Sequence, residues 1–230
     1  MTARLRATSI TPEMDDSDAE PTPAAAMAAQ LEQLEQLRSN VNLTDATTVP
    51  LLSPEECAEI VAGLDDDGWR EMEVWAAAPE AAARGAHRRE ALPDVRRGRL
   101  RTAPGGNNGE LVRRITEQVF DVNRRIYRFR LVGVEHSVQL LWYSGESADG
   151  YIAHMDIGPS ASLRKLSFSL LLSDPATFDG GDLAFGAPFA LARAQGTLTI
   201  FPSFLQHAVT PVTRGDRHAV VGFAIGPAFV

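Results

Sequence analysis

Three residues in the second half of the chain, His154, Asp156 and His207, could together bind a metal ion. The first two lie two positions apart in the segment YIAHMD (residues 151–156), which has the pattern of a β-strand. Side chains two apart on a strand point to the same face, so the imidazole and the carboxylate would converge. The second histidine follows in FPSFLQH (residues 201–207). The simpler alternative is a partly buried histidine that is hydrogen-bonded to the nearby aspartate.

A fixed positive charge follows these three residues in the sequence. Two imidazoles and one carboxylate on one side of an ion, with open positions opposite, form the facial arrangement of non-haem Fe(II) sites. Arg217 lies ten residues after His207, and the turn at residues 214–216 predicts a hairpin that brings it back beside His207. An arginine in a dry interior needs an anionic partner. That partner would be a ligand carboxylate or, alternatively, Asp174, Asp179 or Asp182.

The pattern around these residues predicts a mostly β protein after residue 129 and a helical one before it. Short apolar runs separated by turn residues are typical of a sandwich or jelly roll. They cover residues 129–134, 137–143, 151–156, 165–173, 182–186, 197–201, 207–212 and 218–225. Helical spacing of apolar residues predicts helices over 24–39, from 54 to about 64 and over 110–127, with a first strand at 69–77.

One segment, residues 79–109, has an unusual composition. It carries seven arginines against three acidic residues and ends in a cluster of turn-forming residues. We expect a long loop here, and loops of this length often act as lids over active sites. Arg96, Arg97 and Arg99 would then bind an anionic substrate. The alternative is a solvent-exposed loop whose charges have no specific role.

Length and composition limit the function classes. The chain has 230 residues, a net charge of -8 and one cysteine. These features favour a single domain at 49–230, preceded by a disordered tail at 1–23 and a helix with linker at 24–48. The charge argues against a nucleic-acid partner. The lack of long apolar runs predicts neither a secretory signal nor a membrane span. We therefore expect a cytoplasmic protein, and the oligomeric state stays open.

Residues 49–230 resemble the Fe(II)/2-oxoglutarate-dependent dioxygenases of the prolyl-4-hydroxylase-like type. The resemblance is carried by LLSPEECAEIV, QLLWYSGES, YIAHMD, RKLSFSLLLSD, FDGGDL and FPSFLQHAVTPVTRGDRHAVVGF. It implies a double-stranded β-helix (jelly roll) core with supporting N-terminal α-helices. It also implies Fe(II), 2-oxoglutarate and O₂, with ascorbate as a stimulant. The reaction would hydroxylate an unactivated C–H of a small-molecule, amino-acid or peptidyl substrate and release succinate and CO₂.

The resemblance also implies a role for individual residues. His154, Asp156 and His207 would be the iron ligands, and Arg217 would bind the distal carboxylate of 2-oxoglutarate. Tyr143, Ser167 and Ser169 would add hydrogen bonds to the same co-substrate. Some relatives place a tyrosine near the position of Leu171, where this chain is apolar. This departure changes the finer co-substrate contacts and leaves Arg217 in its role.

Two other function classes stay open at this stage. One is a cupin-type metal enzyme that does not use 2-oxoglutarate, which the placement of Arg217 argues against. The other is a non-catalytic jelly-roll binding module, which would have no need of an intact set of metal ligands.

Overall fold

The computed structural model describes residues 22–24, 26–28, 30, 44–77, 87–106, 109–136, 138–186, 189–191 and 193–229. The chain divides into two units, Met1–Asn40 and Val41–Val230. In the first unit, residues 23–24, 26–28 and 30 are helical, in line with the helix expected near residue 24. Nearly all of the tail expected at 1–23, and the remainder of the helix predicted over 24–39, lie outside the described residues.

The second unit is built on a large antiparallel sheet, and it is mostly β as predicted. Its strand order within the described residues is β1-β14-β10-β17-β8-β6-β2, with β7 paired to β17. The bounds are β1 (Thr47–Pro50), β14 (Thr197–Pro202), β10 (Arg164–Leu171), β17 (Asp216–Ile225), β8 (Gln139–Ser144), β6 (Arg99–Thr102), β2 (Arg70–Glu71) and β7 (Gly133–Val134).

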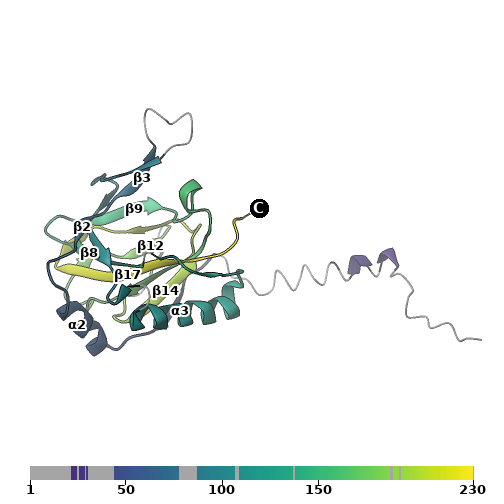
Figure 1. The fold of residues 1–230 in the computed structure, drawn as a ribbon, viewed down its shortest axis with the longest axis horizontal. Coiled ribbons are helices and arrows are strands. Elements are labelled where there is room, and N and C mark those ends of the chain that lie inside the picture. Colours follow the sequence, from purple (N-terminus) through teal and green to yellow (C-terminus); the bar gives the residue numbers. More distant parts are fainter. Residues whose placement is uncertain are drawn as a thin grey trace, which may run out of the picture. The chain divides into compact units, whose positions relative to one another are not determined.

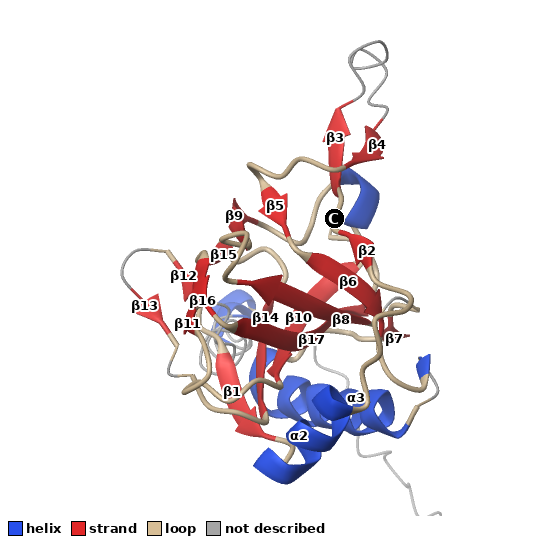
Figure 2. Ribbon diagram, turned by 90° about the vertical axis from the view of Figure 1, so that its left-hand side faces the viewer, coloured by secondary structure: helices blue, strands red, loops and turns tan. Residues whose placement is uncertain are grey.

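A smaller antiparallel sheet faces the large one, as in a jelly roll (Figure 2). Its order is β13-β12-β15-β9-β5, with bounds β13 (Phe189–Ala190), β12 (Leu183–Phe185), β15 (His207–Val209), β9 (Gly150–His154) and β5 (Arg96–Arg97). Two further pairs complete the described strands. They are β11 (Asp179–Gly180) with β16 (Val212–Arg214), and β3 (Val74–Ala77) with β4 (His87–Glu90).

Two helices cover the other face of the large sheet (Figure 1). The first, α2 (Pro54–Ala62), begins with the predicted capping box, in which Ser53 and Glu56 each bond the other's backbone N–H. The second, α3 (Glu110–Val122), continues as the π-helix η4 (Asn123–Tyr127). Arg114 of α3 joins the two helices through Glu56, at 2.6 Å. No helix in the described part of the chain is long and apolar enough to span a membrane.

Apolar side chains fill two layers of this unit. The larger cluster lies between the helices and the large sheet and includes Ile115, Val119, Leu140, Leu166 and Leu170, each with no exposed surface. The smaller cluster lies between the two sheets and includes Met72, Leu100, Leu141, Phe178 and Val212. The first layer therefore holds the helices onto the sheet, and the second joins the two sheets around a cavity.

Two sequence-based predictions about the first half of the unit were wrong. The first strand is β1, before α2, and the segment 69–77 forms two short strands, β2 and β3, in place of one. The described parts of 79–109 are not a loop, because they contain β4, β5 and β6. These strands are two to four residues long and rich in arginine, so they lack the alternation that marks a strand in a sequence. They form because β6 pairs with β8 and β5 pairs with β9.

Candidate metal centre and co-substrate cavity

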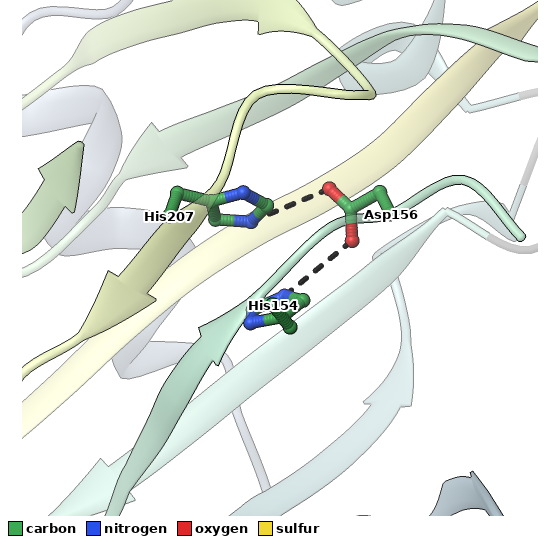
Figure 3. A group of neighbouring side chains, drawn as sticks. All are labelled: His154, Asp156 and His207. Carbon is green, nitrogen blue, oxygen red and sulfur yellow. Dashed lines mark ion pairs between the residues drawn. The ribbon is translucent and has the colours of Figure 1, made fainter. Parts of the chain in front are cut away.

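The three candidate metal ligands come together on the smaller sheet (Figure 3). His154 ends β9 and His207 begins β15, and these two residues are direct partners in the antiparallel pairing of the strands. Asp156 lies just past the end of β9, where its N–H donates to the Ser203 carbonyl at 2.9 Å. Potential ligand atoms of all three lie within 4.8 Å of one another. An ion could therefore contact them all from one side.

Hydrogen bonds set the ring orientation of both histidines. His154 Nδ1 lies 2.8 Å from the Ile152 carbonyl, and His207 Nδ1 lies 3.0 Å from the Leu205 carbonyl. Because a carbonyl only accepts, both Nδ1 atoms carry the proton. Both Nε2 atoms then face Asp156, at 3.5 and 3.4 Å, with a lone pair free for a metal.

The protonation states of this group also suit a metal. Burial lowers the pKa of His207 below its usual value. Burial alone would raise the pKa of Asp156, but its close contacts with the His154 and His207 imidazoles and the hydrogen bond from Ser167 hold that pKa below the usual value. At neutral pH this favours a charged carboxylate and a neutral His207, which are the forms that bind metal. The donor set therefore fits Fe(II).

Asp156 has two supports that the sequence analysis did not find. The hydroxyl of Ser167, on β10, donates to Asp156 Oδ2 at 2.6 Å, and Ser203 Oγ lies 3.0 Å from Ser167 Oγ. Arg164 donates to the Asp156 carbonyl at 3.1 Å and pairs with Glu135 through two 2.9 Å bonds. The strand alternation that turns Ser167 toward the cavity was readable from the sequence. Its aspartate partner depends on how the two sheets face each other.

Arg217 lies in the same cavity as His207, but the predicted hairpin is not what brings it there. The turn at 214–216 joins β16 to β17, which belong to different sheets and do not pair with each other. Arg217, on the large sheet, and His207, on the smaller one, therefore face one cavity of about 530 Å³ from its two walls. Tyr143, Ser167 and Ser169 line it as well.

Arg217 is 4% exposed, and its side chain has no ion pair or hydrogen bond with any described residue. Its guanidinium carbon lies 5.6 Å from the centre of the Tyr143 ring. Burial lowers the pKa of Arg217, which shows how unfavourable an uncompensated charge is at this position.

The acidic residues that could have neutralised Arg217 have other partners. Asp179 pairs with Arg214 at 2.7 Å, and Asp182 pairs with Arg193 at 3.3 Å. Asp174 accepts from the N–H of Ala176 at 2.9 Å. An external carboxylate is therefore the partner that best fits Arg217.

Only one of the three arginines predicted to bind substrate reaches this cavity. Arg96 lines it, whereas Arg97 and Arg99 do not. Arg97 donates to the Ser147 carbonyl at 2.9 Å, and the Arg99 guanidinium lies over the Trp142 ring at 4.8 Å. Alternation along a strand separates neighbouring arginines, and a loop prediction could not anticipate this separation.

Comparison with known proteins identifies the part of the chain that carries this site. Residues 138–225 match the family model described as the 2OG-Fe(II) oxygenase superfamily. This part of the chain is therefore similar to the 2OG-Fe(II) oxygenases. The match includes His154, Asp156, His207 and Arg217. This similarity agrees with the Fe(II), 2-oxoglutarate and O₂ that the resemblance had led us to expect.

Individual relatives agree with this assignment. The chain is 38% identical over 92 residues to a PKHD-type hydroxylase of Hyphomonas neptunium, covering 36% of this chain and 41% of that protein. It is 47% identical over 57 residues to the PKHD-type hydroxylase YbiX of Shigella sonnei, covering 24% and 25%. The chain thus matches less than half the length of these relatives.

A solved structure shows the same fold. A prolyl hydroxylase from Trichoplax adhaerens, in complex with a hypoxia inducible factor peptide fragment, aligns with 92% of this chain and 96% of its own. The TM-score is 0.56 and the sequence identity is 15%. The oxygenase domain therefore has the double-stranded β-helix fold, with few helices, as predicted.

Proposed function

We propose that this protein is an Fe(II)- and 2-oxoglutarate-dependent hydroxylase. The observation that carries the proposal is the presence, in one cavity, of a His-Asp-His cluster and a buried arginine without an acidic partner among the described residues. A cupin-type enzyme without 2-oxoglutarate would have no need of that arginine. A non-catalytic module would need neither feature.

Each residue of the site would have its own role in binding the metal or the co-substrate. His154, Asp156 and His207 would hold Fe(II), with Ser167 and Arg164 orienting the aspartate. Arg217 would bind the distal carboxylate of 2-oxoglutarate, and Tyr143 and Ser169 would donate hydrogen bonds to the same molecule. Leu171, which lines a small cavity together with Arg217, has an apolar side chain and leaves the arginine as the main contact for that carboxylate.

Fe(II), 2-oxoglutarate and O₂ together supply the oxidising power that turns a substrate C–H into C–OH, with succinate and CO₂ as co-products. The chain orients the reactants and limits the access of water to them. Apolar walls at Val209 and Phe223 serve that second purpose. Ascorbate would stimulate turnover by keeping the iron reduced. We place the reaction in the reducing cytoplasm, which the single, buried Cys57 supports.

The substrate would be a small molecule, an amino acid or a peptide. The hydroxylase names of the relatives support this range, and the peptide bound by the Trichoplax protein supports its upper end. The decisive experiment supplies Fe(II), 2-oxoglutarate and O₂ with a panel of such substrates and measures succinate. We expect release that depends on substrate and is abolished in Asp156→Ala. Succinate release that persists unchanged in Asp156→Ala would contradict the proposal.

A further inference from the structure

Arg96 holds an unusual position in the cavity. It lies on β5, directly paired with Tyr151 of β9, and its guanidinium carbon is 4.8 Å from the centre of the Tyr151 ring. The Tyr151 ring in turn stacks on His154, with ring centres 3.5 Å apart. Arg96 is therefore separated from a candidate iron ligand by a single aromatic ring.

The hydrogen bonds of Arg96 are incomplete. One terminal nitrogen donates to the Glu73 carbonyl at 3.3 Å. The Nε–H is buried and has no partner among the described residues. A buried donor without a partner is destabilising. Arg96 nevertheless lines the cavity, and the donor fork of a guanidinium matches the oxygens of a carboxylate or phosphate.

The charges that line the cavity favour an anion. Five arginines line it (Arg70, Arg89, Arg96, Arg164 and Arg217), against the acidic residues Glu71, Glu73 and Asp156. This balance is positive in a chain whose net charge is -8. Glu135 neutralises Arg164, and the proposed co-substrate would neutralise Arg217. Of the other three arginines, Arg96 is the one that lies over Tyr151, the ring that stacks on His154 beside the metal site.

We propose that Arg96 binds an anionic oxygen group, a carboxylate or a phosphate, of the substrate. The inference rests on the proposed hydroxylase function and narrows its substrate class. The bound group would lie beside the Tyr151 ring, so the carbon to be oxidised would be only a few bonds away from it. Arg96 would thus select small acidic substrates, or larger ones with an acidic group close to the reacting carbon.

The test observes Arg96 directly by ¹⁵N nuclear magnetic resonance of arginine Nε–H groups. The protein is loaded with Zn(II) as a diamagnetic metal and saturated with 2-oxoglutarate, so that Arg217 is occupied. Loss of one signal in Arg96→Lys assigns it. Acetate, inorganic phosphate and acetamide are then titrated at constant ionic strength.

We expect a saturable shift of the Arg96 signal with acetate or phosphate, and the better ligand identifies the type of anion. The neutral acetamide should give none. Arg97→Lys and Arg99→Lys, matched variants of the neighbouring arginines, should retain the shift. Absence of a saturable shift with either anion, while 2-oxoglutarate stays bound, would overturn the inference. Failure of 2-oxoglutarate to bind would instead contradict the proposed function. Binding of 2-oxoglutarate is measured separately on the same sample.

Discussion

The two faces of β10 carry different kinds of side chain and serve different purposes. Leu166 and Leu170 point to the helices and have no exposed surface. Ser167 and Ser169, which lie between these two leucines in the sequence, point into the cavity. One strand thus contributes hydrocarbon to the core and hydroxyl groups to the site. The helix side of the strand therefore supplies stability, while the cavity side carries polar groups that serve the site, such as the Ser167 hydroxyl that donates to Asp156.

The largest expected effect on stability comes from the helix side. Leu170→Ala should lower the free energy of unfolding by about 2–5 kcal/mol, because it leaves a void in a closed core. Ser169→Ala, one position along and on the cavity side, should change stability by less than about 1 kcal/mol and weaken 2-oxoglutarate binding. Denaturant unfolding and calorimetric titration measure the two quantities. Equal losses of stability in Leu170→Ala and Ser169→Ala would contradict the proposed difference between the two faces of β10.

The next effect concerns the buried cation. Arg217→Ala should weaken 2-oxoglutarate binding by about 2–4 kcal/mol, because it removes a charge-assisted pair in a buried site. Arg217→Lys should restore only part of this, since a point charge cannot reproduce the planar fork. Arg214→Ala, which removes an exposed arginine paired with Asp179, is the control and should leave the affinity unchanged. Comparable losses of 2-oxoglutarate affinity in Arg214→Ala and Arg217→Ala would show that the affinity depends on the net charge of the protein and not on the position of Arg217.

A smaller effect should come from a glycine that makes room for this arginine. Gly181 has φ +65°, and a Cβ there would lie 2.7 Å from Cδ of Arg217. Gly186 has nearly the same φ, +63°, but a Cβ there would meet nothing within 4 Å. Both alanine variants carry similar backbone strain. Gly181→Ala alone should displace Arg217 and weaken 2-oxoglutarate binding about tenfold. Equal affinities in the two variants would show that Gly181 does not position Arg217.

The sequence predicted the parts of the site that depend on local spacing. His154 and Asp156 converge as predicted, although β9 ends at His154 and Asp156 follows it, and the alternation of β10 turned both serines inward. The double-stranded β-helix came from the resemblance and is confirmed by the comparison of folds.

Contacts between distant segments escaped the sequence analysis. Strands β5 and β6 exist through pairing with the distant strands β9 and β8, and such pairing overrides the weak propensity of arginine-rich segments. The same pairing between distant strands separates Arg96 from Arg97 and Arg99. It also places His207 and Arg217 on opposite sheets. The bond from Ser167 to Asp156 likewise crosses from one sheet to the other, so no local pattern marks it.

The central claim is that one cavity holds a metal and 2-oxoglutarate together, with the metal bound by His154, Asp156 and His207. Its most direct test is calorimetric titration of 2-oxoglutarate into protein loaded with Mn(II), an inactive substitute for Fe(II). The account predicts one 2-oxoglutarate per chain, bound at least tenfold more tightly with the metal than without it. His207→Ala should remove this metal dependence. Equal affinity in the metal-free protein and the Mn(II)-loaded protein would contradict the account.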